Sequence, residues 1–435
     1  MHNRYIILLF LFFIICCENK PNHDVLANVG SRQVTSFEFS ETYSNKLINT
    51  QLKDSEFERN RHFEFLIRNK LFSEAALRNQ LQLDSIAKRY IHLDSIRFLR
   101  DELYYEEILN KEINVDETEI RKHYIWSKRE CHLKHLFFNN KDDADSIYII
   151  LTSKPEVFDS IAFQTFNEEK LKQSRGDLGW IRYNALDPNL EKVGFDMELD
   201  EISLPVQSSF GWHILKKLDE KNQMITDEAE FQNNKKRIKN TIIQKSHQIR
   251  SDQFVNQIML QKNILLDDRL IEDVTKALFQ LIQLRSDDKI LIDKKSEVLK
   301  NLITNLRDLS HLPLAKYDDG SFLVQDYIDG IQFLAPQKNQ PPQALFYHTL
   351  RNQILSQEGG KRGLGDHPNV KLKIQDSRDR FLSQIFLSNL YDGENNIKKE
   401  ELTKISDSLR SITSIITYQE NLDRLFKLET SSPSS

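Results

Sequence analysis

The chain has 435 residues, of which 39% are hydrophobic and 29% charged, with a formal net charge of −5. This length predicts roughly two to four domains rather than one. The charge shows no clustered basic stretch, which excludes the electrostatic pattern of a nucleic-acid-binding protein. Only 12 glycines and 10 prolines occur, and this composition favours long, solvent-exposed helices.

The first residues have the pattern of a targeting segment. Arg4 precedes the apolar run "YIILLFLFFII" (5–15), which is too short to span a bilayer but typical of a signal peptide. Ile14, Ile15 and Cys16 then precede Cys17, a pattern similar to a bacterial lipobox. We therefore expect a lipoprotein signal peptide over residues 1–17 and lipidation of Cys17, which would hold the protein on the periplasmic side or the surface of the cell envelope. The alternative is an ordinary signal peptide with incidental cysteines.

Residues 18–128 are predicted to form an N-terminal helical module. After a short polar leader and a strand-like start, apolar residues such as Phe63, Leu66 and Leu71 recur at helical spacing. Asp116 fits an N-cap, with Glu119 three residues later as its capping-box partner. This segment therefore has the features of a helical body.

Residues 129–219 have a different pattern. "ECHLKHLFF" alternates as a strand, two short helical stretches follow, and "GDLGWI" enters a second strand. A short helix over "DPNLEKVGFDM" and two strands, "ISLPVQSS" and "GWHILKKLD", complete a compact α+β unit. Cys131, which would be the sole free thiol once Cys17 is lipidated, is expected to be a small hydrophobic residue of the first strand, without a disulfide.

The remaining chain returns to helical patterns. Residues 220–310 are expected to pack on the N-terminal module, residues 311–427 to form a C-terminal helical module, and residues 428–435 to be disordered. The tail resembles the head: Gly30, Val34 and Phe37 have counterparts in Gly320, Val324 and Tyr327 at a constant offset. We expect a duplicated module, the alternative being chance similarity between leucine-rich amphipathic helices.

Five sequence blocks in the middle of the chain carry a family resemblance. "KHLFF", "FDSIA", "RGDLGWI", "EISLPVQSS" and "FGWHIL" follow one another as in parvulin-type (PpiC, rotamase) peptidyl-prolyl isomerase domains, which this segment resembles. Such a domain between long helices is similar to the SurA-like and PrsA-like foldases, in which the helices form a chaperone lobe. The expected fold is α+β: a small parvulin-like domain, an antiparallel-rich sheet with four helices, inserted between long-helix segments, so that the chain is mostly α overall.

The resemblance implies the candidate catalytic residues. His135 and His213 correspond to the paired histidines of the family, and Ser208 to a hydroxyl near them. Strand alternation places His135 on one face with Cys131 and Leu133. The acidic position is Glu169 or Glu168, and we favour Glu169. The alternatives are hydrogen-bonded core histidines and a solvated acidic loop.

The proline pocket of the family corresponds here to apolar residues, for which ordinary core packing is the alternative: Leu178, Leu186, Leu190 and Phe210. The clustered glycines Gly176, Gly179 and Gly211 are expected where the backbone turns sharply or approaches another strand closely. No metal site is expected, because no close paired histidine spacing accompanies the candidate residues.

The implied reaction is rotation about X-Pro amide bonds, which requires differential binding of the twisted amide and no cofactor. The implied function is that of a membrane-anchored extracytoplasmic foldase acting on proline-containing segments of unfolded or nascent exported proteins. The alternative is a holdase chaperone in which a weak or inactive parvulin domain serves as a peptide-binding platform.

Overall fold

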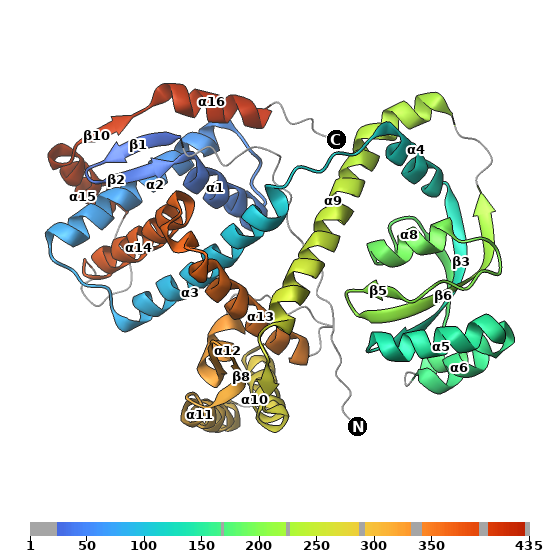
Figure 1. Ribbon diagram of the computed structural model, residues 1–435. Helices are drawn as coiled ribbons and strands as arrows, with labels where there is room; N and C mark the ends of the chain where they lie inside the picture. The colour runs from blue at the N-terminus through green and yellow to red at the C-terminus, as the bar shows by residue number, and fades with distance from the viewer. Residues whose placement is uncertain are drawn as a thin grey trace. The chain divides into compact units, whose positions relative to one another are not determined.

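The computed structural model of the protein describes residues 24–166, 169–222, 227–286, 292–331, 342–390 and 399–430. These residues fall into two compact units (Figure 1). The central unit runs from Tyr104 to Arg351, and the terminal unit combines the residues before Tyr104 with those from Asn352 onward. The predicted signal peptide and Cys17 lie outside the described residues. None of the described helices has the length and apolarity that crossing a membrane requires.

The terminal unit packs helices on a small antiparallel sheet. Strands β1 (Val25–Val29) and β2 (Arg32–Thr35) form a hairpin, and β10 (Ile415–Thr417) pairs with the other edge of β1. The helices are α1 (Ser36–Thr50), α2 (Glu56–Arg78), α3 (Ser85–Tyr104), α14 (Pro368–Ser388), α15 (Lys399–Ile412) and α16 (Gln419–Thr430). Buried side chains of β1, α1 and α2 share a core with Leu422 of α16. Segments from both ends of the chain thus build one hydrophobic core.

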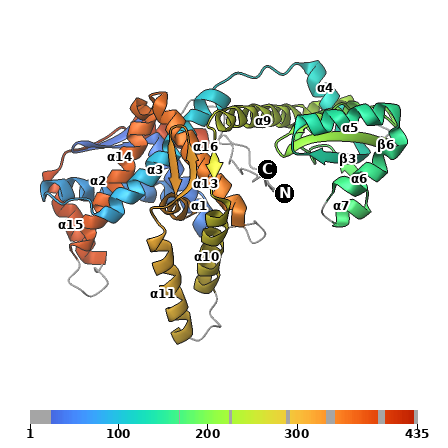
Figure 2. The same ribbon diagram turned by 60° about the horizontal axis from the view of Figure 1, so that its bottom comes forward.

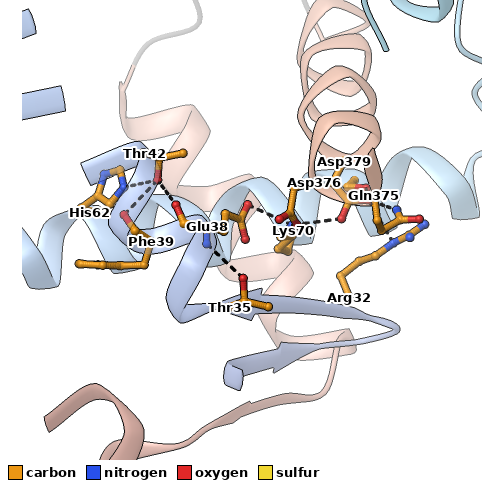
Figure 3. Close-up of polar contacts among 11 residues, drawn as sticks. Arg32, Thr35, Glu38, Phe39, Thr42, His62, Lys70, Gln375, Asp376 and Asp379 are labelled. Atoms are coloured by element: carbon orange, nitrogen blue, oxygen red, sulfur yellow. Dashed lines mark hydrogen bonds and ion pairs between the residues drawn. The ribbon is translucent and has the colours of Figure 1, made fainter. Parts of the chain in front are cut away.

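A buried ionic cluster joins three helices of the terminal unit (Figure 3). Lys70 of α2 is 1% exposed, and its Nζ lies 3.1 Å from Glu38 of α1 and 2.7 and 3.1 Å from Asp376 and Asp379 of α14. Burial raises the pKa of Glu38 to about 8, against the lowering effect of Lys70. The cluster therefore holds a carboxyl that is protonated at neutral pH beside a buried ammonium group.

The first part of the central unit is a four-stranded antiparallel sheet with helices on both faces. The strands are β3 (Arg129–Phe138), β4 (Asp177–Arg182), β5 (Val206–Ser208) and β6 (Gly211–Asn222), in the order β4-β3-β6-β5. Four helices belong to it, α5 (Lys141–Ser153), α6 (Phe158–Thr165), α7 (Glu169–Gln173) and α8 (Pro188–Asp196), with a 3-10 turn over Pro155–Val157. In Figure 1, α5 and α6 lie on one side of the sheet and α8 on the other. This is the predicted α+β domain.

The predicted strand over "ISLPVQSS" is shorter than expected. Only Val206–Ser208 forms β5, and Ile202 makes an isolated bridge to Lys216. Ser203 pairs with Leu215 in a mixed way: its N–H donates a hydrogen bond to the Leu215 carbonyl, and its Oγ, in place of its carbonyl, accepts one from the Leu215 N–H. A proline at position 205 supplies no N–H for a continuous ladder.

The rest of the central unit is mostly helical. Helix α4 (Glu117–Trp126) begins at Asp116, whose side chain accepts a hydrogen bond from the Glu119 N–H as predicted for an N-cap, and a π-helical turn over Tyr105–Leu109 precedes it. Helix α9 (Glu228–Leu260) packs on α4 through Phe231, Ile238 and Ile242. The later elements are β7 (Leu265–Leu266), α10 (Asp268–Ser286), α11 (Ile292–Asp308), β8 (Pro313–Tyr317), β9 (Gly320–Leu323), α12 (Val324–Ile331) and α13 (Pro342–Lys361), the last continuing into the terminal unit.

Two parts of the chain share a local design. The β8–β9 hairpin leads directly into α12, as the β1–β2 hairpin leads into α1, close to the repeat offset in the sequence. In each sheet a third strand, β7 or β10, pairs antiparallel with the first hairpin strand and is followed by a helix, α10 or α16. Figure 2 shows α10 and α11 side by side. The duplication of residues 18–128 in residues 311–427 stays a prediction that this correspondence supports.

The grouping of segments differs from the expected order of modules. Helix α9 contacts α4, the last helix of the segment 18–128, but the earlier helices of that segment share their unit with residues from Asn352 onward. The reason is that β10 and α16 supply an edge strand and core side chains to the β1–β2 sheet. Helix α16 continues to Thr430, so residues 428–430 of the predicted tail are helical, and residues 431–435 lie outside the described residues.

Candidate active site

Two neighbouring strands bring His135 and His213 together. In the β3–β6 pairing, His135 lies opposite Leu215 and His213 lies opposite Phe137. Opposed residues of an antiparallel pair project to the same face, so the two histidines are diagonal neighbours on one face of the sheet. Their rings are stacked with centroids 5.5 Å apart and an interplanar angle of 17°.

The histidines belong to a short hydrogen-bonded chain. The Nδ1 atoms of His135 and His213 are 3.2 Å apart, and His213 Nε2 is 2.9 Å from the Oγ of Ser208. Ser208 Oγ also accepts a hydrogen bond from the Phe210 N–H at 3.0 Å. His135 Nε2 is buried without a hydrogen-bond partner among the described residues. The structure thus brings three of the four sequence-predicted catalytic residues into one connected group.

Burial keeps both imidazoles neutral at physiological pH. It lowers the pKa of His135 to about 4. It also lowers the pKa of His213, to about 3, and the neighbouring His135 adds to that effect. A neutral imidazole has one donor and one acceptor nitrogen, so a single proton between the two Nδ1 atoms fixes the tautomers of both rings.

The acidic candidates have a different placement. Glu169 is the first residue of α7, is exposed, and accepts a hydrogen bond from Gln173 Nε2 at 2.8 Å within the same helix. Among the described residues, no hydrogen bond joins Glu169 to either histidine. Glu168 lies outside the described residues. The role of this position stays a prediction.

Three of the predicted pocket residues pack in the hydrophobic core of the domain, and the fourth is exposed. Leu190 of α8 packs with Met197 and Leu215, the residue opposite His135. Leu178 and Leu186 pack against the cluster of Trp126, Cys131, Leu133 and Phe195. Phe210, at the tip of the β5–β6 turn, is 41% exposed. Of the four, Phe210 therefore offers the most side-chain surface to a ligand.

Two further aromatic rings flank the histidine pair. The Phe166 ring lies 5.1 Å from the His135 ring, and the Phe137 ring lies 5.2 Å from the His213 ring, measured between centroids. Strand alternation could have identified Phe137, because it is two residues after His135 on the same face. Phe166 follows α6, and no pattern in the sequence indicates that it reaches β3.

Two glycines allow neighbouring segments of the chain to approach the backbone of β3 closely. A Cβ at Gly176, whose φ is +73°, would lie 2.1 Å from the His135 carbonyl oxygen, and the Gly176 carbonyl accepts a hydrogen bond from the His135 N–H at 2.9 Å. A Cβ at Gly211, whose φ is +147°, would lie 2.7 Å from the Phe138 carbonyl oxygen. Both positions need glycine for close approach to the strand that carries His135.

Asp187 ties two sides of the site together. It caps α8 by accepting a hydrogen bond from the Asn189 N–H at 2.9 Å, while its other oxygen accepts hydrogen bonds from the N–H and Oγ of Ser209. Ser209 follows Ser208 in the β5–β6 turn. One carboxylate therefore links the start of α8 to the turn beside His213, a contact that the sequence analysis missed.

The single described thiol lies in the interior. Cys131 is fully buried in β3, and burial raises its pKa to about 11. It therefore remains a protonated thiol within the apolar cluster of Trp126 and Leu133.

Comparison with known proteins identifies the central domain. Residues 139–219 match the family described as Rotamase, the PPIC-type PPIASE domain, a match that begins just after β3. The chain is 28% identical over 191 residues to foldase protein PrsA 1 of Bacillus cereus, covering 44% of this chain and 62% of that protein. It is 29% identical over 111 residues to chaperone SurA of Thiobacillus denitrificans, covering 24% of this chain and 26% of that one.

The chain thus spans less than two thirds of the length of these relatives. Among solved structures, the peptidylprolyl isomerase PrsA of Bacillus anthracis is similar at 20% identity with a TM-score of 0.26, covering 50% of this chain and 88% of that one.

Proposed function

Because the central unit carries a PpiC-type rotamase domain, we propose that the chain catalyses cis/trans isomerisation of X-Pro peptide bonds. The observation that supports this best is the pair of neutral, hydrogen-bonded histidines His135 and His213, with Ser208 in contact. Glu169, or Glu168, is the proposed acidic member of the site. Phe210, Leu178, Leu186 and Leu190 are the proposed contacts of the proline ring.

The proposed mechanism uses binding alone. The barrier to rotation arises from amide resonance and is about 18–20 kcal/mol. A site lowers this barrier if it binds the twisted amide more strongly than either planar isomer. Neutral imidazoles suit this task, because they present fixed donors and acceptors without a charge that would need solvation in a buried site. No bond is made or broken, so the reaction needs no cofactor.

We place this activity in an extracytoplasmic foldase anchored to the membrane through Cys17. The leader pattern supports export and lipidation, and relatives named foldase and chaperone support a role in protein folding. The proposed partners are unfolded or partly folded exported proteins and their proline-containing segments.

Two observations favour the second candidate function, a holdase with a weak isomerase domain. Glu169 is exposed and bonded within its own helix, and three of the proposed pocket leucines contact the apolar core. A peptide-binding platform needs neither an acidic residue at the histidines nor a deep proline pocket.

An isomerisation assay on the full chain separates the two functions. Exchange between cis and trans forms of a peptide with one X-Pro bond is followed by NMR, and we expect a rate well above the uncatalysed one. His135→Ala and His213→Ala should each lower this rate, whereas His311→Ala, at an exposed position of the same unit, should not. A wild-type rate equal to the uncatalysed one would reject the isomerase proposal and leave the holdase as the proposed function.

A further inference from the structure

A buried carboxylate in the isomerase domain has its counterion on a helix beyond that domain. Glu191 of α8 is 1% exposed, and its two oxygens accept hydrogen bonds from the Asn184 N–H and from Lys245 Nζ. Lys245 is 9% exposed and belongs to α9, well past residue 219, where the family match ends. The pair therefore joins α8 to α9 within the central unit.

The surroundings of this ion pair are closely packed. Lys245 Nζ lies 3.8 Å from the centre of the Tyr183 ring, and Tyr183 Oη is 2.8 Å from His123 Nδ1 of α4. Residues from α4, α8, α9 and the loop that follows β4 thus enclose the two charges. Because a buried charge without a partner is costly, Glu191 and Lys245 each depend on the other.

Glu191 holds the loop that enters α8. It binds the N–H of Asn184, which has a left-handed φ of +70°. The same loop carries Leu186, a proposed pocket residue, and Asp187, which is bonded to Ser209 beside Ser208. A shift of this loop would therefore move both the apolar contacts and the turn that orients the Ser208 hydroxyl.

We infer that Lys245 is a positioning residue of the isomerase site, since it neutralises Glu191 and thereby fixes the loop 183–187, so that α9 is a working part of the isomerase domain. This inference rests on the proposed isomerase function. A fragment that ends at residue 219 would therefore be an incomplete enzyme, because it lacks Lys245, the cation paired with Glu191.

The neighbouring titratable groups do not supply a replacement charge. Burial raises the pKa of Tyr183 and raises that of Cys131 to about 11, and it lowers the pKa of His123 to about 4. All three are therefore neutral between pH 5 and pH 9. Burial also raises the pKa of Glu191, and Lys245 opposes that effect.

Other charged side chains act on these neighbours. Lys122 and Lys192 lower the pKa of His123, and Asp196 raises it. Arg237 lowers the pKa of Tyr183. Arg237 is exposed and bonded to Asn234, and Lys122 is paired with Asp196. The removal of Lys245 therefore leaves Glu191 as a buried carboxylate that gains a proton more readily.

The test compares four full-length variants: Lys245→Met, Glu191→Gln, the double variant Lys245→Met/Glu191→Gln, and Lys239→Met as a matched control at an exposed position of α9. At pH 8 we expect Lys245→Met to raise KM for the proline peptide on the order of tenfold with little change in kcat, because a charged Glu191 left unpaired displaces the loop. The double variant should return to within about twofold of wild type, because the glutamine amide can still accept the Asn184 N–H.

The pH profile separates charge from packing. Protonation of Glu191 should shrink the Lys245→Met defect at pH 5.5, whereas a defect that arises from lost packing would be equal at both pH values. An unchanged KM in Lys245→Met, or a double variant as impaired as Lys245→Met, would overturn the inference.

Amide exchange of Asn184 gives a readout that does not depend on activity. We expect fast exchange in Lys245→Met and slow exchange in wild type, the double variant and the Lys239→Met control. If wild type lacks isomerase activity, the proposed function fails, yet exchange at Asn184 still decides whether Lys245 fixes the loop. If Lys245→Met does not fold, the double variant Lys245→Met/Glu191→Gln decides: slow Asn184 exchange with a KM within about twofold of wild type supports the inference, and a raised KM contradicts it.

Discussion

The Nδ1 atoms of His135 and His213 face each other at 3.2 Å, a distance at which one of them donates and the other accepts a hydrogen bond. If His213 donates, its Nε2 accepts the Ser208 hydroxyl proton; if His135 donates, His213 Nε2 donates to Ser208. The tautomers of both rings and the direction of the serine hydroxyl are therefore coupled.

Loss of the Ser208 hydroxyl should weaken this coupling. In Ser208→Ala, the buried His213 Nε2 loses its partner, which costs about 1–3 kcal/mol. We expect kcat/KM for a proline peptide to fall roughly tenfold, as measured by NMR exchange. Ser208→Thr keeps the hydroxyl and should retain most of the activity; equal loss in both variants would show that the hydrogen bond is not the cause.

The central unit should be less stable at acid pH than at neutral or alkaline pH. Since burial lowers the pKa of His135 to about 4 and of His213 to about 3, the unfolded state binds more protons than the folded state below pH 6.5. The contribution of these neutral histidines to the stability of the central unit is thus fully present above about pH 6.5 and decreases as the pH falls toward 4. Buried His123 acts in the same sense, and Asp252, with a pKa raised to about 6 by burial, opposes it.

Tryptophan fluorescence measures this transition selectively, because all three tryptophans, Trp126, Trp180 and Trp212, belong to the central unit. The expected result is a denaturation midpoint that declines from pH 6.5 to pH 4.5. A midpoint that rises over this range would contradict neutral buried histidines.

The Lys70 cluster should give the terminal unit the opposite response. Burial raises the pKa of Glu38 to about 8, so the folded state retains a proton that the unfolded state has lost, and stability declines as pH rises toward 8. The window from pH 6.5 to 8 excludes buried His62, whose pKa is lowered to about 4 and which changes stability only below pH 6.5. Asp376 of the same cluster, whose pKa burial also raises, acts in the same sense as Glu38.

Glu38→Gln mimics the protonated carboxyl and should flatten this slope, which is at most about 1.4 kcal/mol per pH unit for one group. Hydrogen exchange of peptides from α1 and α2 measures it. Parallel slopes in wild type and Glu38→Gln would assign the pH dependence to another group.

Glycine substitutions should differ sharply with position. Gly176→Ala places a methyl group 2.1 Å from the His135 carbonyl oxygen at a left-handed φ, and we expect a loss of at least about 2 kcal/mol of stability. Gly360→Ala, in α13 with open space around the added Cβ, should stabilise the protein by about 0.5–1 kcal/mol. Thermal unfolding followed by circular dichroism measures both, and a neutral Gly176→Ala would contradict the close approach to β3.

The residues of the site that could be predicted from the sequence are those that belong to short-range sequence patterns. Alternation along β3 placed His135 with Cys131 and Leu133, and the ordered sequence blocks placed His213 and Ser208 beside it. Glu191 and Lys245 could not be identified in this way, because on amphipathic helices an acid and a base far apart in sequence have the pattern of solvated residues. Only the packing of α8 on α9 shows that both are buried, and the same holds for Lys70 and its carboxylates.

The pairing of β1 with β10 joins Ala27 to Thr417, residues near opposite ends of the chain. The four-stranded sheet of the central unit is formed entirely by residues 129 to 222, so it can assemble while later residues are still being synthesised. The terminal unit must wait until residues 415–417 have been synthesised, so its first strand keeps an uncovered edge until then.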